Sequence, residues 1–149
     1  MTASGAELAR GRALHPGSAS GPALVLEPLS FWGGLAWEDG RIIDVHHPAC
    51  GRSLSGTVLV MPHGRGSSSA AAVMAEVVRR GTGPVAVVVR STDVILLVGA
   101  IAAAELYGVR CPVVQLDPEA FAAVAAHDGA ALAVEAGDED GVIRLAASS

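Results

Sequence analysis

The sequence of 149 residues has few aromatic residues, few cysteines and no long apolar run. Phe, Trp and Tyr make up 3% of it although 51% is hydrophobic, so the core must be built from Val, Ala, Leu and Ile. The two cysteines, Cys50 and Cys111, are too few for a disulfide framework or a self-contained four-cysteine cluster site. The most apolar run, 94–104, is shorter than the roughly 18–20 residues that span a bilayer.

Basic patches and an apolar leader are also missing. The net charge of -5 argues against a general nucleic-acid-binding protein, which would carry a basic footprint. No run of like charges indicates a charged tail or a membrane-binding patch. The first residues lack the apolar core of a signal peptide. We therefore expect a cytoplasmic protein and, because no change in composition marks a linker, a single domain over residues 1–149.

The first half of the sequence predicts strands. Two are expected near 7–14 and 22–27, with a Pro/Gly/Ser turn between them. The Glu-Asp-Gly segment 38–40 predicts a turn, and 41–45 a short strand behind it. The apolar run 56–62 is bounded by Gly and Pro, which favours a strand buried on both faces.

The second half alternates between strand and helix patterns. Val73, Val77 and Val78 share one helical face, and Gly81 gives that helix a conventional end. The expected helices are 67–81, 93–108 and 117–129, and the expected strands are 84–89, 111–116, 130–136 and 141–146. This order predicts an α/β fold with buried parallel strands and crossover helices. The β-rich start must then supply a second sheet or close a barrel.

A glycine pair and three serines lie between a predicted buried strand and a predicted helix. Gly64 and Gly66 permit a tight turn, and the helix N-terminus stabilises a negative group beside it. That group could be a ligand phosphate or carboxylate, or a serine oxygen that acts as a base. Alternatively, one of Ser67, Ser68 and Ser69 simply caps the helix. The segment matches neither a P-loop nor a hydrolase elbow.

Three motifs together resemble the small, swivelling subunit of aconitase X proteins: PLSFWGG (28–34), GRSLSG (51–56) and GRGSSS (64–69). The resemblance covers roughly residues 10–116. It implies an aconitase-like swivelling β/β/α domain that pairs with, or is fused to, a large subunit holding an iron–sulfur cluster. Family members are hydro-lyases. One branch resembles cis-3-hydroxy-L-proline dehydratase, and another resembles mevalonate 5-phosphate dehydratase.

The resemblance also implies roles for the serine segment. The corresponding loop of aconitase reads G-x-G-S-S-R-E, and its first serine removes a proton from the substrate. The match makes Ser67 the expected catalytic base and Ser68 a substrate contact, with Gly66 and Arg65 as further substrate-binding residues. Arg65 could instead be a solvated loop residue. Ser69 replaces the arginine that grips a carboxylate in aconitase, which argues against a citrate-like substrate.

Because the chain has no plausible cluster site, we expect no metal or cofactor in it and an iron–sulfur cluster in the large subunit. Dehydration needs a base and a Lewis acid on the departing hydroxyl, and the partner would supply the latter. His46, His47 and His63 either form a metal site or hydrogen-bond locally. Phe31 and Trp32 either form a lid or docking surface or fill the core.

The main functional hypothesis is the small subunit of a two-chain hydro-lyase that is active only with its large subunit. The expected substrate is a small hydroxy acid, with cis-3-hydroxy-L-proline ahead of mevalonate 5-phosphate. The alternative from another class is a non-catalytic swivel module that presents an anion-binding loop. A free-standing phosphate-ester enzyme is disfavoured because the P-loop lysine and a cluster of metal ligands are missing.

Overall fold

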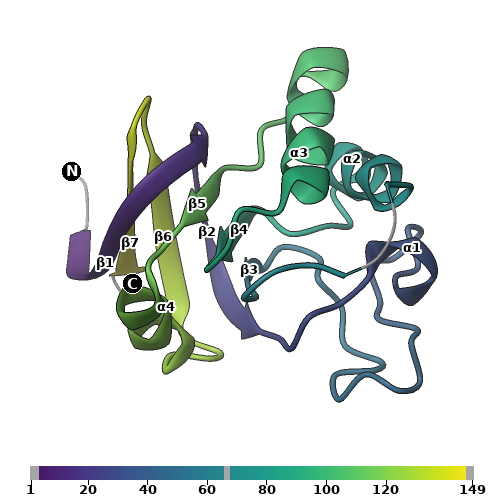
Figure 1. Ribbon diagram of the computed structural model, residues 1–149, viewed down its shortest axis with the longest axis horizontal. Coiled ribbons are helices and arrows are strands. Elements are labelled where there is room, and N and C mark those ends of the chain that lie inside the picture. Colours follow the sequence, from purple (N-terminus) through teal and green to yellow (C-terminus); the bar gives the residue numbers. More distant parts are fainter. Residues whose placement is uncertain (1–3, 66–67, 147–149) are drawn as a thin grey trace.

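Residues 4–65 and 68–146, which the computed structural model describes, form a closed barrel with helices outside it (Figure 1). The strands are β1 (Ser4–His15), β2 (Gly17–Val25), β3 (Val58–Val60), β4 (Ala86–Val89), β5 (Val113–Gln115), β6 (Ala131–Ala136) and β7 (Asp140–Ala146). The helices are α1 (Phe31–Gly34), α2 (Ala70–Arg80), α3 (Val94–Tyr107) and α4 (Pro118–Ala125).

The barrel combines a parallel half with an antiparallel half, in the order β1-β5-β4-β3-β2-β6-β7. Strands β2, β3, β4 and β5 are parallel neighbours, and α2 and α3 connect β3 to β4 and β4 to β5. The hairpin β6–β7 pairs with β2 on one side and with β1 on the other, always antiparallel. The predicted parallel strands with crossover helices are therefore confirmed, and the β-rich start closes a barrel.

The central strands are buried on both faces, as their continuous apolar sequence predicts. On β3, Val58 and Val60 belong to the core inside the barrel, whereas Leu59 and the following Met61 belong to the core beneath the helices. All four side chains are buried. Successive side chains from Val58 to Met61 therefore alternate between the two cores.

Helices α2 and α3 lie side by side on one side of the barrel, and α4 lies elsewhere on its surface (Figure 1). Val73, Val77 and Val78 are buried on α2, as their shared face predicts, and Gly81 ends the helix in a left-handed conformation. Helix α3 begins after Asp93, whose carboxylate accepts a hydrogen bond from the Leu96 N–H. In the described ranges, no helix is long and apolar enough to cross a membrane.

Several predictions for the first half differ from the structure. Strand β1 begins at Ser4, before the predicted residue 7, and only residue 16 separates it from β2, so most of the expected turn is strand. Strand β2 begins at Gly17, earlier than expected, because its small residues pair with β6 from Gly17↔Ala136 onward. The predicted strand over 41–45 is wrong: only the isolated bridges Leu35↔Ile42 and Arg41↔Ser53 form there. Ile42 is buried, but the next apolar residues have no neighbouring strand to pair with, so the segment remains an irregular loop.

His15, at the end of β1, is a buried residue whose protonation should oppose folding. Within the described part of the chain, its Nε2 is a buried atom without a hydrogen-bond partner. Burial lowers the His15 pKa, Arg110 lowers it further, and Glu105 partly offsets them. An unperturbed histidine, as in the unfolded chain, has a pKa of about 6.5. As the pH falls, His15 therefore takes up a proton in the unfolded chain before it does so in the folded one. Stability from neutral His15 is present above that value and is lost as the pH falls through the folded pKa.

Replacing His15 by leucine should make the stability of the chain less dependent on pH. Urea unfolding at about pH 7.5 and about pH 5.5 gives the loss of unfolding free energy for each protein. We expect a smaller loss for His15→Leu than for the unsubstituted chain, because the substitution removes one group that binds a proton on unfolding. Equal losses in the two proteins would show that His15 does not contribute to this pH dependence.

Candidate active site

The segment that leaves β3 is held by backbone hydrogen bonds to the next strand. Met61 donates its N–H to the Val88 carbonyl over 3.0 Å. The Pro62 carbonyl accepts from the N–H groups of Arg90 and Ser91, each over 3.0 Å. These bonds continue the β3–β4 ladder beyond the strand ends, so the chain enters the serine segment from a fixed position.

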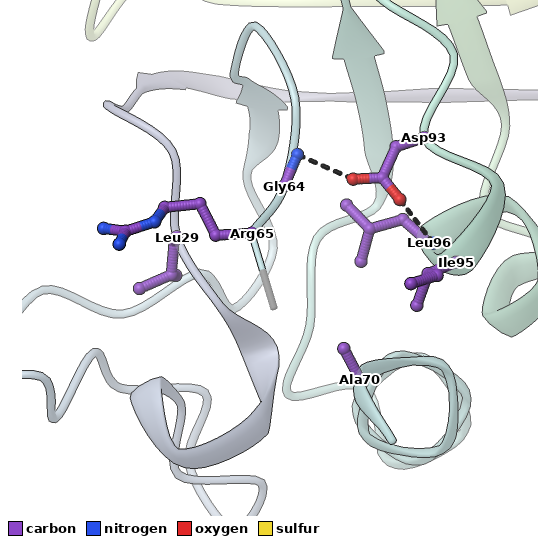
Figure 2. A pocket seen from close by; sticks show the side chains of 7 residues that line it. All are labelled: Leu29, Gly64, Arg65, Ala70, Asp93, Ile95 and Leu96. Carbon is purple, nitrogen blue, oxygen red and sulfur yellow. Dashed lines mark hydrogen bonds between the residues drawn. The ribbon is translucent and has the colours of Figure 1, made fainter. Parts of the chain in front are cut away.

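Gly64 is the next anchor, and it is bound by the residue that caps α3. The Gly64 N–H donates to Asp93 Oδ2 over 2.6 Å, while Asp93 Oδ1 accepts from the Leu96 N–H over 3.0 Å (Figure 2). A Cβ atom at position 64 would lie 2.4 Å from Asp93 Oδ2. The Gly64 φ angle is not in the left-handed region. A larger residue at position 64 would therefore have to displace the Asp93 carboxylate, whereas the backbone turn itself does not require glycine.

Arg65 separates two hollows. Its N–H donates to the Leu29 carbonyl over 3.2 Å, and Figure 2 shows its side chain extending away from Asp93. The smaller hollow is a cavity of about 70 Å³ lined by Leu29, Gly64, Arg65, Ala70, Asp93, Ile95 and Leu96. The larger is an open groove of about 320 Å³ lined by Glu27, Pro28, Asp44, His46, His47 and Arg65. The exposed guanidinium can therefore meet an anion from solution.

The structure describes only some of the residues that the sequence predicts for the site. Ser67, the predicted base, and Gly66 lie outside the described residues. Ser68 is exposed, as a substrate contact requires. Ser69 occupies the N-cap position of α2, but its backbone is helical and its side chain makes no capping hydrogen bond. Ser69 therefore does not cap α2 with its side chain, which was the alternative function predicted for one of the serines.

The N-terminus of α2 faces the serine segment without an acidic residue in its first turn. Arg79 and Arg80 lie in the last turn, where cations complement the helix dipole. The partial positive charge at the N-terminus is therefore not offset by a side chain of that first turn. A helix end of this kind stabilises an anion close to it, whether the anion is a ligand or a deprotonated hydroxyl.

The three histidines do not gather into a metal site. His47 is buried, and its Nδ1 accepts from the Ala49 N–H over 3.0 Å. Its Nε2 therefore carries the proton and donates to the Glu27 carbonyl over 2.9 Å. His63 Nδ1 lies 2.7 Å from the Gly64 carbonyl oxygen. His47 and His63 therefore form local hydrogen bonds, which was the predicted alternative to a metal site.

The described residues also do not fit an iron–sulfur cluster. Cluster ligation requires cysteine thiolates. Burial raises the pKa of the Cys111 thiol to about 12, and Cys50 lies at the surface. Across residues 4–65 and 68–146, no group of three or more His, Cys, Asp or Glu side chains could hold a metal ion.

The aromatic pair of the 28–34 motif is split between core and surface. Phe31 is fully buried beneath the helices, so it fills the core, whereas Trp32 is 60% exposed. Sequence reasoning missed a different contact, the bond between Asp93 and Gly64. Its only signal was the good N-cap type at position 93, since nothing links residues 29 positions apart in a single sequence.

The sequence of the chain is similar to a family model and to known proteins. A sequence model of the aconitase X swivel domain matches residues 8–145. A cis-3-hydroxy-L-proline dehydratase of Pseudomonas aeruginosa is 44% identical over 123 residues, which are 82% of this chain and 21% of that protein. A phosphomevalonate dehydratase small subunit of Methanothermobacter thermautotrophicus is 41% identical over 93 residues, which are 62% of this chain and 71% of that subunit.

The solved structures agree in fold. The crystal structure of Thermococcus kodakaraensis aconitase X in its holo-form matches with a TM-score of 0.74 and 29% identity, over 89% of this chain and 95% of that one. The chain spans about a fifth of the length of the hydroxyproline dehydratase that it matches. Because the sequence model covers nearly all of the chain and the barrel has the same fold, the chain belongs to the aconitase X swivel domain family.

Proposed function

We propose that the chain, acting over residues 1–149 as one domain, is the swivelling component of an aconitase X hydro-lyase. It would work with a larger partner, as a heterodimer or a higher assembly. The observation that carries this proposal is the position of segment 64–69: it follows β3, precedes α2 and is bound to the N-terminus of α3. Relatives whose names include "small subunit" support the two-component organisation.

In this proposal Ser67 removes the proton from the substrate carbon. A serine hydroxyl is a weak base, so its deprotonated form must be stabilised electrostatically. The N-terminus of α2, with no acidic residue in its first turn, supports that role. Ser68 and Gly66 would contact the substrate, and the exposed guanidinium of Arg65 would bind its carboxylate.

The departing hydroxyl requires a group that this chain does not provide. The described residues do not fit an iron–sulfur cluster, and we infer that the large partner holds it. When bound there, the cluster would supply a Lewis acid for the hydroxyl. The chain described here would contribute the base, the substrate-binding cation and the surface that completes the site.

The favoured substrate is cis-3-hydroxy-L-proline. Similarity to the hydroxyproline dehydratase extends over 82% of this chain, compared with 62% for the phosphomevalonate dehydratase small subunit. Phosphomevalonate is the alternative substrate, since Arg65 could bind a phosphate as well as a carboxylate. A non-catalytic swivel that only presents an anion-binding loop remains the alternative function.

An assay of the assembled enzyme tests the proposal. The chain is produced together with its large partner, cluster content is checked by absorption spectroscopy, and loss of each substrate is followed by mass spectrometry. We expect consumption of cis-3-hydroxy-L-proline by the assembly and no consumption by the chain alone. Consumption of phosphomevalonate instead would support the alternative substrate. An assembly with an intact cluster that consumes neither compound would contradict the dehydratase proposal.

A further inference from the structure

We propose that Asp93 is a positioning residue of the dehydration site and that it fixes the backbone at Gly64, where the serine segment begins. This inference rests on the proposed function, because it assigns the reacting serine to that segment. Asp93 is partly buried and lies at the wall of the small cavity beside Gly64 and Arg65 (Figure 2). Nothing in the proposal requires it to contact substrate.

The first observation is that Asp93 uses its two oxygens for different elements. Oδ1 caps α3 at the Leu96 N–H, and Oδ2 accepts from the Gly64 N–H. The second bond, at 2.6 Å, joins the carboxylate to a different segment of the chain, 29 residues away in the sequence. Capping alone needs only one oxygen. Asp117 shows this at α4, which it caps through Oδ1 to the Ala120 N–H over 2.8 Å.

The second observation is that the Asp93 carboxylate occupies the space that a side chain at position 64 would need. The nearest atom to a Cβ built on Gly64 is Asp93 Oδ2, at 2.4 Å, and the next is Leu96 Cδ1 at 3.4 Å. Since the Gly64 φ angle does not demand glycine, the main obstacle to a Cβ at this position is the Asp93 carboxylate, which would have to move. The two positions therefore form a matched pair across separate elements.

The consequence for the site follows from chain connectivity. Gly64 lies two residues before Gly66 and three before Ser67, so a displacement of its backbone is carried into the segment that bears the proposed base. Displacements of about 1 Å near reacting atoms can lower a rate by about 100-fold. The bond from Arg65 to the Leu29 carbonyl anchors the same segment from the opposite side.

Asp93→Asn separates positioning from capping. Asparagine caps helices as well as aspartate does, so its oxygen can keep the Leu96 bond while its NH₂ group faces the Gly64 N–H and cannot accept from it. In the assembled enzyme we expect kcat to fall by about 10- to 100-fold with KM changed less than about threefold. Asp117→Asn is the matched control, because it changes a cap of the same kind without a bond to the serine segment, and it should keep normal kcat.

A double-substitution cycle checks that the effect passes through Gly64. Gly64→Ala alone should lower kcat, because its Cβ displaces the carboxylate or the loop. In an Asp93→Ser background, where the shorter cap leaves room, adding Gly64→Ala should lower kcat much less than it does alone. Additive losses, or normal kcat in Asp93→Asn with an intact cluster and melting temperature, would overturn the proposal.

A measurement without turnover distinguishes failure of this inference from failure of the proposed function. In the ¹⁵N-labelled chain, the Gly64 amide proton should exchange slowly with solvent, and Asp93→Asn should accelerate its exchange by at least about tenfold while Asp117→Asn does not. Unchanged Gly64 exchange in Asp93→Asn would overturn the tether even if the enzyme were active. Accelerated exchange in an assembly that dehydrates neither substrate would support the tether and reject the function on which its positioning role depends.

Discussion

Replacing Ser67 by alanine should abolish measurable turnover of the assembled dehydratase. A positioned base contributes about 10²- to 10⁴-fold to a rate, and neither of the residues that flank Gly66 and Ser67 in the sequence can replace it. Ser68 is a hydroxyl of the same weak basicity, and Arg65 is a cation. The measurement is kcat on cis-3-hydroxy-L-proline for the purified assembly, with cluster content matched between the variant and the unsubstituted enzyme.

The same substitution should leave the assembly intact, because it removes a single hydroxyl. Size-exclusion chromatography of the variant with its partner would verify this. Ser91→Ala is a suitable control: Ser91 is an exposed serine whose backbone binds Pro62 in the same region, and this variant should retain full activity. Near-normal turnover by an assembled Ser67→Ala enzyme would remove Ser67 as the base and favour the non-catalytic swivel.

Replacing Phe31 by alanine should destabilise the chain by about 3–5 kcal/mol. Phe31 is fully buried and packs in the core beneath the helices together with Leu29, Leu35 and Met74. Truncation would remove the transfer free energy of the ring and leave a cavity in the core, where Phe31 has the largest of the fully buried side chains. Guanidinium unfolding at neutral pH measures the change in unfolding free energy, provided that the slope with denaturant stays the same.

Trp32→Ala is the matched control in the adjacent position. Its side chain is 60% exposed, so its loss should change stability by less than about 0.5 kcal/mol. Similar losses for the two variants would contradict the division of this pair between core and surface. The earlier alternative of a docking aromatic now concerns Trp32 alone, and the affinity of Trp32→Ala for the large partner tests it.

The parts of the fold that depend on local pattern could be predicted from the sequence. The apolar run at β3 and the valine face of α2 each satisfy one physical requirement, burial on two faces or on one. The strand over 41–45 was predicted wrongly. In the described part of the chain this segment forms only isolated bridges and does not pair with a strand that would stabilise it. A short apolar pattern does not reveal whether such a partner exists.

Contacts between distant residues could not be read from the pattern. The family resemblance directed attention to the serine segment, but a single sequence does not show that the Asp93 carboxylate lies against Gly64. Aspartate is a common N-cap residue, and its second oxygen acquires a function once β3 and α3 are brought together. The barrel closure is a similar case, since it depends on how β1 pairs with β7.

That closure has a consequence for the order in which the chain folds during synthesis. Strand β1 is made first, yet it pairs with β5 and β7, and β7 extends to Ala146. Until β6 and β7 leave the ribosome, β1 and β2 lack their β7 and β6 neighbours. Contacts between the two ends of a chain form slowly, because a long loop must close before they contribute stability. A sheet formed before β6 and β7 are made would expose the β1 and β2 edges, and exposed strand edges favour association between chains.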